Sequence, residues 1–380
     1  MSPTPAPALS LVVCTLNEAE SVGAVLREAS GVLAGMSHEI IVVDDSSDEA
    51  TADVVRAYAA IVPAVRLVRR PGARGLASAA IAGWDAARGR ALAIVDGDGQ
   101  HDLSLLPGMV DELDGDAEVV VASRYILGET GLSGVRDAGS RLATGACTML
   151  LGARASDPLS GYFVMRQDWY AAVRPRLTGI GFKILVDVLA SGARAPRIAE
   201  VSTSLRPRIG GASKLDLGVM VDLAALLVEK RTRGAVSARF LMFSGVGVSG
   251  MFIHAALLIL TYRHGAGVPF SVAQAIGILG AMNWNFFVNN ALTFRDRRLK
   301  GAGLIRGLLA FYLCCAAGGM ISEALATFLK GHGVQWLVAG MTGAVVAGVW
   351  NYQTSKRGTW DAASLAEGAR AIFRPRAELK

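Results

Sequence analysis

Two acidic residues separated by one position, Asp96 and Asp98, follow directly after the apolar run Ala91–Val95. At the end of a β-strand, both carboxylates can turn toward one bound cation. Hard oxygen ligands of this kind suit Mg²⁺ or Mn²⁺, and the oxygens of a diphosphate can complete the coordination shell. Such a metal neutralises the charge that builds on a departing nucleotide diphosphate. The pattern therefore predicts a site for a divalent metal and a nucleotide diphosphate.

A second acidic pair, Asp44-Asp45, follows the run Glu39–Val43. One of these carboxylates could accept N–H bonds from a nucleobase. The competing interpretation is local, because the polar residues 46–48 can cap the helix that follows. We expect one aspartate to serve each purpose.

The segment 70–76 supplies flexible backbone and positive charge for a phosphate, and Arg74 lies within it. It does not match the G-x-G-x-x-G pattern of dinucleotide-binding loops. A dinucleotide-binding fold therefore gains no support from this segment.

Short apolar segments alternate with helical segments in the part of the chain that carries these acids. We expect strands at Leu9–Thr15, Glu39–Val43, Val65–Val68 and Ala91–Val95, with helices at about 20–33, 49–60 and 77–87. This alternation predicts an α/β fold with a mostly parallel sheet and helices on both faces. Ligands bind beyond the carboxyl ends of the strands in such sheets. Three of these strands end in carboxylates at that edge.

The last third of the chain is different in composition. Four long runs contain one acid, Glu323, and no other formally charged residue: Phe240–Tyr262, Phe270–Phe294, Gly307–Leu329 and Val334–Tyr352. Each run is long enough to cross a hydrocarbon core of about 30 Å. Four such runs in succession, separated by short charged loops, favour transmembrane helices over buried core helices. Functional and structural roles are both open for the intramembrane Glu323 and His254.

Loop charge predicts the orientation of these spans. Lysines and arginines gather before the first span, between the second and third spans and after the fourth, whereas the other two loops hold only Arg263 and Lys330. Under the positive-inside rule, both termini and the catalytic part lie on the cytosolic side of the cell (inner) membrane. Residues 1–10 lack the pattern of a cleaved signal peptide. The four cysteines form no C-x-x-C pair, which fits a reducing compartment.

The formal net charge of +6 suits anionic lipids or phosphorylated ligands. No basic patch interleaved with aromatic residues occurs, so we do not expect a nucleic acid as partner. Segments 215–228 and 135–151 have apolar faces with basic residues, which is typical of interfacial helices. A core helix is an equal alternative for the second segment. We see no internal repeat of fixed period.

Taken together, the motifs resemble those of a family 2 glycosyltransferase of the GT-A fold, of the dolichyl- or polyprenyl-phosphate mannose synthase type. Cys14 and Leu16 stand where the family has proline and tyrosine. The membrane part resembles the four-helix GtrA-type domain, most clearly over 283–295. The matching segments occur in the family's order: 13–18, 42–48, 96–101, 123–125, 136–141, 157–162 and 208–214.

The resemblance implies roles for individual residues. Those implied for the nucleotide sugar are Cys14, Leu16, Glu18, Asp44, Asp45, Arg74, Asp96, Gly97, Asp98, Arg208, Ser213 and Lys214. Those implied for the metal are Asp96, Asp98 and Gln100, and those implied for the acceptor phosphate are Arg124, Arg136, Ser140 and Arg141. Asp98, Arg124 and Arg208 are expected to take part in catalysis.

A chemical argument also favours a phosphate as the acceptor. Transfer of a sugar to an alcohol needs a general base, whereas a phosphate monoester is already ionised at neutral pH. It needs cations that hold it beside an anionic donor, and Arg124, Arg136, Arg141 and Arg208 can supply them. Direct attack by a phosphate oxygen inverts the anomeric carbon.

We therefore expect a GT-A catalytic domain over 1–214, an interfacial helix and linker over 215–236, a four-span domain over 237–353 and a cytosolic tail over 354–380. The expected reaction transfers one hexose, mannose from GDP-mannose, to dolichyl or polyprenyl phosphate with Mg²⁺ or Mn²⁺. Alternatives are UDP-glucose or another UDP-sugar as donor, and a lipid-linked sugar translocator or anchor with an inactive transferase. A processive synthase lacks support, since no Q-x-x-R-W motif follows residue 215.

Overall fold

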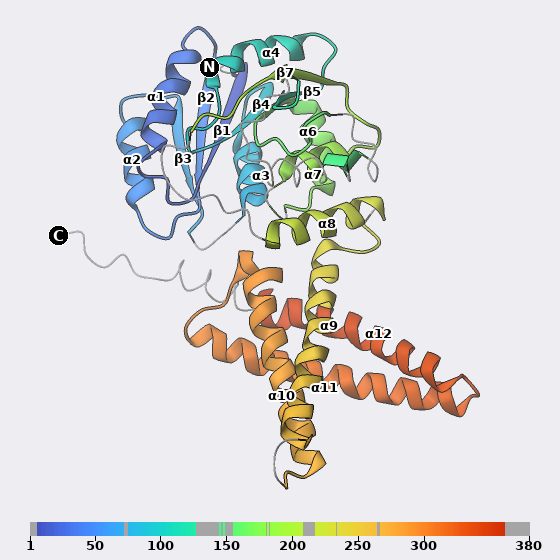
Figure 1. Ribbon diagram of the computed structural model, residues 1–380. Helices are drawn as coiled ribbons and strands as arrows, with labels where there is room; N and C mark the ends of the chain where they lie inside the picture. Colours follow the sequence, from blue (N-terminus) through green and yellow to red (C-terminus); the bar gives the residue numbers. More distant parts are fainter. Residues whose placement is uncertain are drawn as a thin grey trace, which may run out of the picture. The chain divides into compact units, whose positions relative to one another are not determined.

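The chain forms two compact units, Met1–Val236 and Ser237–Lys380, each described by itself. The structure is a computed structural model (Figure 1), and it describes residues 6–71, 75–126, 144, 145, 147, 148, 155–179, 181, 183–207, 217–232, 234–263 and 267–361. The first unit is built around one sheet, and the described part of the second contains helices and no strand.

Seven strands form the sheet of the first unit, in the order β3-β2-β1-β4-β6-β5-β7. Only β6 runs antiparallel to its neighbours, so the predicted mostly parallel sheet is confirmed. The four strands expected from the sequence form at or within one residue of the predicted positions. The bounds are β1 Leu9–Thr15, β2 His38–Asp44, β3 Val65–Arg69, β4 Ala91–Asp96, β5 Val119–Ser123, β6 Phe163–Arg166 and β7 Ile198–Ser202.

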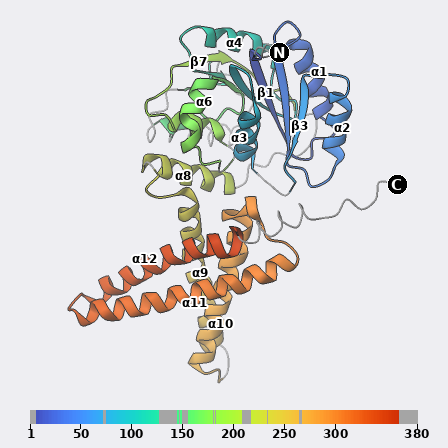
Figure 2. The ribbon, with the colours of Figure 1, turned by 180° about the vertical axis from the view of Figure 1, so that it is seen from behind.

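Helices cover both faces of this sheet, as a view from behind also shows (Figure 2). Apolar side chains of α1 (Val22–Val32), α2 (Ala50–Ala59) and α4 (Leu106–Asp114) pack on one face, with the short η1 (Leu103–Leu105). Those of α3 (Leu76–Ala86), α6 (Gln167–Val173) and α7 (Ile184–Ala190) pack on the other. The central strands are apolar over almost their whole length because both of their faces are buried.

The short η2 (Arg174–Arg176) and α8 (Leu217–Arg231) complete the described helices of this unit. Buried leucines of α8 pack against Val186 of α7 and Leu159, so α8 has its own small apolar cluster. Lys230 of α8 pairs with the buried Asp187 of α7 at 2.6 Å. These contacts fix α8 to the rest of the first unit, while its place at a membrane surface stays a prediction.

The second unit contains a helix at each of the four predicted spans. The bounds are α9 Ala238–Leu258, η3 Ile259–Arg263, α10 Phe270–Val288, η4 Asn289–Thr293, η5 Arg295–Arg297, α11 Ala302–Gly331, α12 Trp336–Ser355 and η6 Lys356–Asp361. Among the described residues, Ala238–Tyr262 and Ala302–Gly331 are long and apolar enough to cross a membrane. In the other two helices, polar residues such as Asn285 of α10 and Asn351 of α12 interrupt the run of apolar residues. That α10 and α12 also cross the membrane stays a prediction.

Polar residues near the end of α10 face protein, as expected of polar groups at membrane depth. Asn290 is 3% exposed. Its Oδ1 accepts hydrogen bonds from Leu299 N at 2.8 Å and from Trp360 Nε1 at 3.1 Å, and its Nδ2 donates to Leu299 O at 3.2 Å. One amide side chain thus ties the end of α10 to the following loop and to η6.

Candidate active site

The carboxyl ends of three strands meet at one edge of the sheet. Thr15 at the end of β1 pairs with Asp44 of β2, and Cys14 pairs with Asp96 of β4. The backbone continues this alignment beyond the strands, because Asp45 N donates to Thr15 O at 3.0 Å and the residue after Asp96 donates to Cys14 O. The two acidic pairs predicted from the sequence are therefore neighbours across β1.

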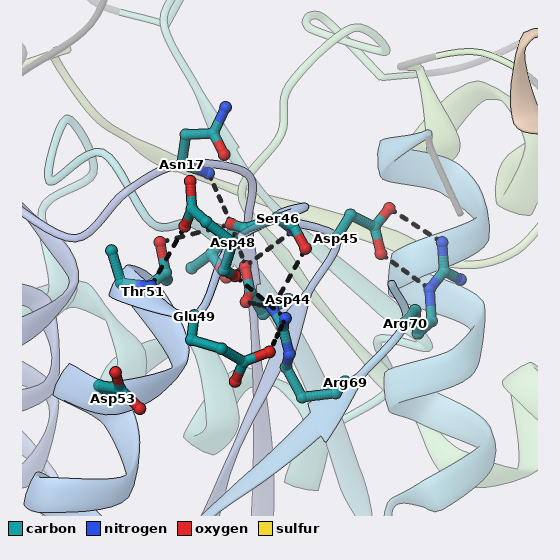
Figure 3. Close-up of polar contacts among 12 residues, drawn as sticks. Asn17, Asp44, Asp45, Ser46, Asp48, Glu49, Thr51, Asp53, Arg69 and Arg70 are labelled. Atoms are coloured by element: carbon teal, nitrogen blue, oxygen red, sulfur yellow. Dashed lines mark hydrogen bonds and ion pairs between the residues drawn. The ribbon is translucent and has the colours of Figure 1, made fainter. Parts of the chain in front are cut away.

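Asp44 is fully buried and serves the architecture of this edge (Figure 3). Its Oδ1 accepts hydrogen bonds from Thr15 Oγ1 at 3.1 Å and Ser46 N at 3.2 Å. Arg69 forms an ion pair with the other oxygen. A buried carboxylate is stable only when its oxygens are satisfied in this way. The geometry gives Asp44 the local role that the sequence left open between the two aspartates.

Asp45 faces a different partner. Its two oxygens receive a bidentate ion pair from Arg70, with Nε at 2.9 Å and Nη2 at 3.0 Å. Figure 3 shows this pair. Arg70 also donates to Ser78 at the start of α3, where Nη2 lies 2.9 Å from Oγ. Each carboxylate oxygen has two lone pairs, so a carboxylate can accept N–H groups in addition to one bidentate ion pair. Arg70 fixes the orientation of Asp45.

A turn after β1 positions Leu16 and Glu18. Asn17 adopts a left-handed backbone with φ of 60°, and its N–H donates to Ser46 Oγ at 2.8 Å (Figure 3). Glu18 N donates to Thr51 Oγ1 at 3.0 Å. Leu16 is half-buried beside them. Hydrogen bonds to residues after β2 therefore hold this turn in place. They bring the segments 13–18 and 42–48, both predicted to bind the nucleotide, next to each other.

The turn after β4 needs a glycine between its two acids. A Cβ added at Gly97 would lie 2.6 Å from Thr15 Cγ2, so only glycine fits against β1. Ser21 Oγ donates to Gly97 O at 2.7 Å and secures the turn from α1's side. Asp98 Oδ1 accepts from Gln100 N at 3.1 Å, which is a local turn stabilised by the aspartate itself.

The residues of this turn fit a divalent metal that is shared with a substrate. Among the described residues, no group of three or more His, Cys, Asp or Glu side chains is spaced to hold a metal alone. Mg²⁺ usually takes one or two protein carboxylates, with water and phosphate oxygens as its other ligands. The Asp96 side chain is 33% exposed, and a Cβ at Gly161 would lie 3.3 Å from its Oδ2. A glycine thus leaves space in front of the carboxylate.

Gln100 and His101 connect this turn to other segments. Gln100 Nε2 donates to Arg206 O at 3.1 Å, and Arg206 N donates to Gln100 O at 2.9 Å. His101 Nε2 lies 3.6 Å from Asp96 Oδ2, and its ring lies 5.2 Å from that of Tyr162. Gln100 therefore fixes the chain just before the predicted donor-binding segment 208–214.

Arg124 follows β5 and forms a bidentate ion pair with Asp157. Its Nε lies 2.6 Å from Asp157 Oδ2 and its Nη2 lies 2.8 Å from Oδ1. The carboxylate of Asp157 is fully buried, whereas the Arg124 side chain is 12% exposed. Asp157 thus orients a guanidinium whose bidentate geometry suits phosphate as well as carboxylate.

Lys183 interacts electrostatically with Arg124, Asp157 and Asp96, and the sequence analysis did not single it out. Its Nζ donates to Leu159 O at 3.1 Å. Burial lowers the pKa of the ammonium, Arg124 acts in the same direction, and Asp157 and Asp96 oppose both effects. The ammonium is therefore within electrostatic reach of the metal turn and of the Arg124–Asp157 pair. The signal in the sequence that could have pointed to it is a lysine directly before the mostly apolar segment Ile184–Ala190.

Comparisons with known proteins agree with this site. The model described as "Glycosyl transferase family 2" matches residues 10–174, and that of the "GtrA/DPMS, transmembrane domain" matches 242–360. The dolichol-phosphate mannosyltransferase of Pyrococcus furiosus is 27% identical over 93% of this chain and 99% of its own. That of Mycosarcoma maydis is 32% identical over 59% of this chain and 79% of its own. This chain belongs to glycosyl transferase family 2.

The chain is accordingly a glycosyltransferase, with a GtrA/DPMS transmembrane domain that makes it a membrane protein. The names of the relatives give more than one sugar, mannose in some and galacturonate in another. The dodecaprenyl-phosphate galacturonate synthase of Rhizobium johnstonii is 29% identical over 67% of this chain and 75% of its own. What its relatives share is a sugar that is joined to a polyprenyl phosphate.

Several residues that the resemblance singles out lie outside the described residues. These are Arg74, Arg136, Ser140, Arg141, Arg208, Ser213 and Lys214. The structure brings the other predicted residues to the sheet edge formed by β1, β2 and β4, with Arg124 at the end of β5. Their ligand-binding roles stay predictions.

Cys14 lies between the two acidic turns. Burial raises the pKa of its thiol well above the ordinary value, and the negative charges of Asp96 and Asp45 raise it further. A thiol held neutral in this way is a poor nucleophile. Cys14 therefore contributes a small apolar surface to the site.

Proposed function

We propose that the chain transfers a single mannose from GDP-mannose to dolichyl or polyprenyl phosphate, with inversion at the anomeric carbon. One observation carries the proposal: the strand register aligns the Asp45 turn and the Asp96–Asp98 turn on either side of β1. A nucleoside bound at Asp45 would extend its diphosphate toward the second turn. The names of the relatives, which join sugars to polyprenyl phosphates, support the acceptor class.

The donor site in this proposal joins a base-binding carboxylate to a shared metal. Asp45, oriented by Arg70, accepts N–H groups of the base. Asp96 and Asp98, with Gln100, hold Mg²⁺ or Mn²⁺ against the diphosphate, and the bound metal stabilises the negative charge of the leaving nucleotide. Arg74, Arg208, Ser213 and Lys214 contact the phosphates, and Cys14, Leu16, Glu18 and Gly97 complete the donor site.

The proposed acceptor site is mainly cationic, and a phosphate acceptor needs no general base. Arg124 binds the acceptor phosphate, held in orientation by Asp157, and Arg136, Ser140 and Arg141 add contacts. Arg136 and Ser140 stand four residues apart, so on a helix they share one face. We add Lys183, because its ammonium lies within reach of the charges of both Arg124 and Asp96. Together these groups allow two anionic substrates to approach each other.

The domain boundaries complete the proposal. Residues 1–214 form the catalytic domain, 215–236 the interfacial helix and linker, 237–353 the four-span domain and 354–380 a cytosolic tail. The catalytic domain and both termini lie on the cytosolic side of the cell membrane. The basic loops on that side support this orientation.

UDP-glucose or another UDP-sugar is the second candidate donor. A relative whose name gives galacturonate as the sugar supports keeping this alternative. Asp45 can accept N–H groups from guanine and from uracil, so the carboxylate itself does not choose between the bases.

Calorimetry on the purified full-length protein tests the donor and the metal. We expect GDP to bind more tightly than UDP, and Mn²⁺ to strengthen binding. Asp98→Ala should remove the strengthening by Mn²⁺, because one of two carboxylate ligands is lost. The exposed Asp114→Ala at the end of α4 is the matched control and should behave as wild type. Tighter binding of UDP would favour the second donor, and equal affinity with and without Mn²⁺ in the wild type would refute the metal site.

A further inference from the structure

Two stretches of the membrane unit have identical or similar residues at the same spacing: tryptophan, asparagine and threonine are identical, and an aromatic residue stands at each of two further positions. Trp284-Asn285-Phe286 in α10 is followed by Thr293-Phe294, and Trp350-Asn351-Tyr352 in α12 is followed by Thr359-Trp360. In both, the α-helix continues into a π-helix, η4 at Asn289–Thr293 and η6 at Lys356–Asp361. These two stretches stand against the expectation that the chain has no internal repeat of fixed period.

The preceding helices repeat the same contacts with these stretches. A Cβ added at Gly250 of α9 would overlap Asn285 Oδ1, and one added at Gly318 of α11 would overlap Asn351 Oδ1. In each hairpin, the missing side chain of a glycine on one helix therefore leaves room for the amide side chain of an asparagine on the other helix. Small residues allow such approach between membrane helices, and Cα–H···O contacts accompany it.

A second pair of contacts preserves the same spacing. Gly277 of α10 packs on His254, four residues after Gly250, and Gly343 of α12 packs on Ser322, four residues after Gly318. Gly277 stands eight residues before Asn285, as Gly343 does before Asn351. Hairpin α9–α10 and hairpin α11–α12 thus share a register as well as a motif.

The exposed faces agree as well. At equivalent positions, Phe252 is 72% exposed and Met320 is 69% exposed. Trp284 and Trp350 are 42% and 40% exposed. The two tryptophans and the unlike pair Phe252 and Met320 are therefore exposed to nearly the same extent at equivalent positions.

The two hairpins contact each other through aromatic rings, and each contact has a counterpart made by the equivalent residues of the other hairpin. The ring centroids of Phe243 in α9 and Tyr352 in α12 are 5.6 Å apart. Those of the equivalent residues, Phe311 in α11 and Phe286 in α10, are 5.7 Å apart. The remaining equivalent pair, Phe294 and Trp360, stack on each other at 4.0 Å and 10°. A residue that contacts its own equivalent lies on a two-fold axis.

We propose that the membrane unit is one helical hairpin used twice, and that its aromatic cluster is the surface by which each hairpin binds the other about a pseudo-two-fold axis. The cluster comprises Phe243, Phe286, Phe294, Phe311, Tyr352 and Trp360. The four proposed spans give each hairpin two, so both copies would enter the membrane from the same side and the axis would run along the membrane normal. The partner of this surface is a second copy of the hairpin, supplied within the chain.

Alanine at the paired glycines tests the equivalence of the hairpins in the full-length protein. Gly250→Ala and Gly318→Ala should lower Tm in detergent by similar amounts, because each adds a methyl group where Asn Oδ1 lies. Gly245→Ala and Gly319→Ala are matched controls, since a Cβ there meets nothing within 4 Å. Alanine favours helix over glycine, so the controls should keep or raise Tm. A loss of Tm in only one hairpin, or losses equal to those of the controls, would overturn the duplication.

Double-mutant cycles test the surface between the hairpins. Phe243→Ala with Tyr352→Ala, and Phe311→Ala with Phe286→Ala, should each lower Tm by less than the sum of the single changes, because contacting residues are coupled. The exposed pair Phe252→Ala and Met320→Ala should be additive. If the alanine variants do not fold, Phe→Leu changes serve for the same cycles. Additivity in either aromatic pair would refute the proposed interface.

Discussion

The two aspartates after β2 differ in what surrounds them. The sequence predicted one nucleobase contact and one local role without assigning them, because both carboxylates stand in the same polar segment. The assignment depends on Arg69 and Arg70, more than 20 residues away at the end of β3, and these pair with Asp44 and Asp45 respectively. Such contacts follow from strand register, which local sequence patterns do not specify.

Lys183 is a site residue that no sequence pattern predicted. It belongs to no acidic or glycine-rich pattern, and only the fold brings it near Asp157 and Asp96. Asp157 lies in the segment 157–162 that resembles the family, but its bidentate pairing with Arg124 is seen only in the structure.

We expect Lys183→Met to raise the KM for polyprenyl phosphate, because the acceptor loses a charge-assisted contact. Losing such a contact costs about 1.5–3 kcal/mol, or roughly tenfold to a hundredfold in affinity. Lys183→Arg keeps the charge and should retain part of the affinity. Steady-state kinetics with both substrates measures the effect. The control is Arg90→Met, an exposed residue before β4 at the opposite end of the strand. Wild-type KM values for both substrates in Lys183→Met would remove this residue from the acceptor site.

Among the elements, the strands differ in how well they could be predicted. β1, β2, β3 and β4 are apolar runs that end in polar turns, and the sequence located all four. It located none of β5, β6 and β7, which have four or five residues each. β6 also lies between β4 and β5 and runs antiparallel, although it follows β5 in the chain. Pairing over such sequence distances depends on the whole fold.

Glu118 stabilises this less predictable edge of the sheet. It precedes β5, and its carboxylate accepts hydrogen bonds from Arg194 and from Arg197 N. The hydrogen bond from Arg194 is the main reason that the pKa of Glu118 falls from 4.5 to about 2, against the effect of burial. A lowered pKa means that the ionised carboxylate stabilises the fold above the unfolded-state pKa, and that this contribution is lost as pH falls toward about 2.

Glu118→Gln should therefore lower Tm near neutral pH, and its difference from wild type should shrink as pH falls from 4.5 to about 2. Thermal unfolding in detergent across this range measures the difference. The exposed Glu112→Gln on α4 is the control and should show no such pH dependence. A Tm difference that stays constant across this range would show that the ionised carboxylate does not stabilise this edge.

For the whole molecule, the sequence predicted an α/β catalytic part followed by a helical membrane part, and the fold and the family comparisons confirm both. It did not reveal the repeat in the membrane part. The two copies share few identical residues, and their equivalence becomes visible through Gly250 with Asn285 and Gly318 with Asn351.

The orientation of the membrane part gives a further prediction. Reporter fusions at Gly265 and Gly331 should be active outside the cytosol, and a fusion at Lys300 should be active inside, because the basic loops stay on the cytosolic side. A pair of reporters that are active on opposite sides, such as alkaline phosphatase and a fluorescent protein, provides the readout. The reverse pattern would refute the orientation, and two spans in place of four would place the fusions at Gly265 and Lys300 on the same side.

Transfer of label into lipid tests the central claim most directly. The purified protein is incubated in vesicles with polyprenyl phosphate, Mn²⁺ and radiolabelled GDP-mannose, with UDP-glucose in a parallel reaction. We expect label from GDP-mannose to enter the organic phase as a single sugar on the lipid phosphate, and to stay in water when polyprenyl phosphate or metal is omitted. Label from UDP-glucose alone would change the donor. If no nucleotide sugar gave a lipid-linked product with the intact protein, the assignment of a polyprenyl-phosphate acceptor would be contradicted.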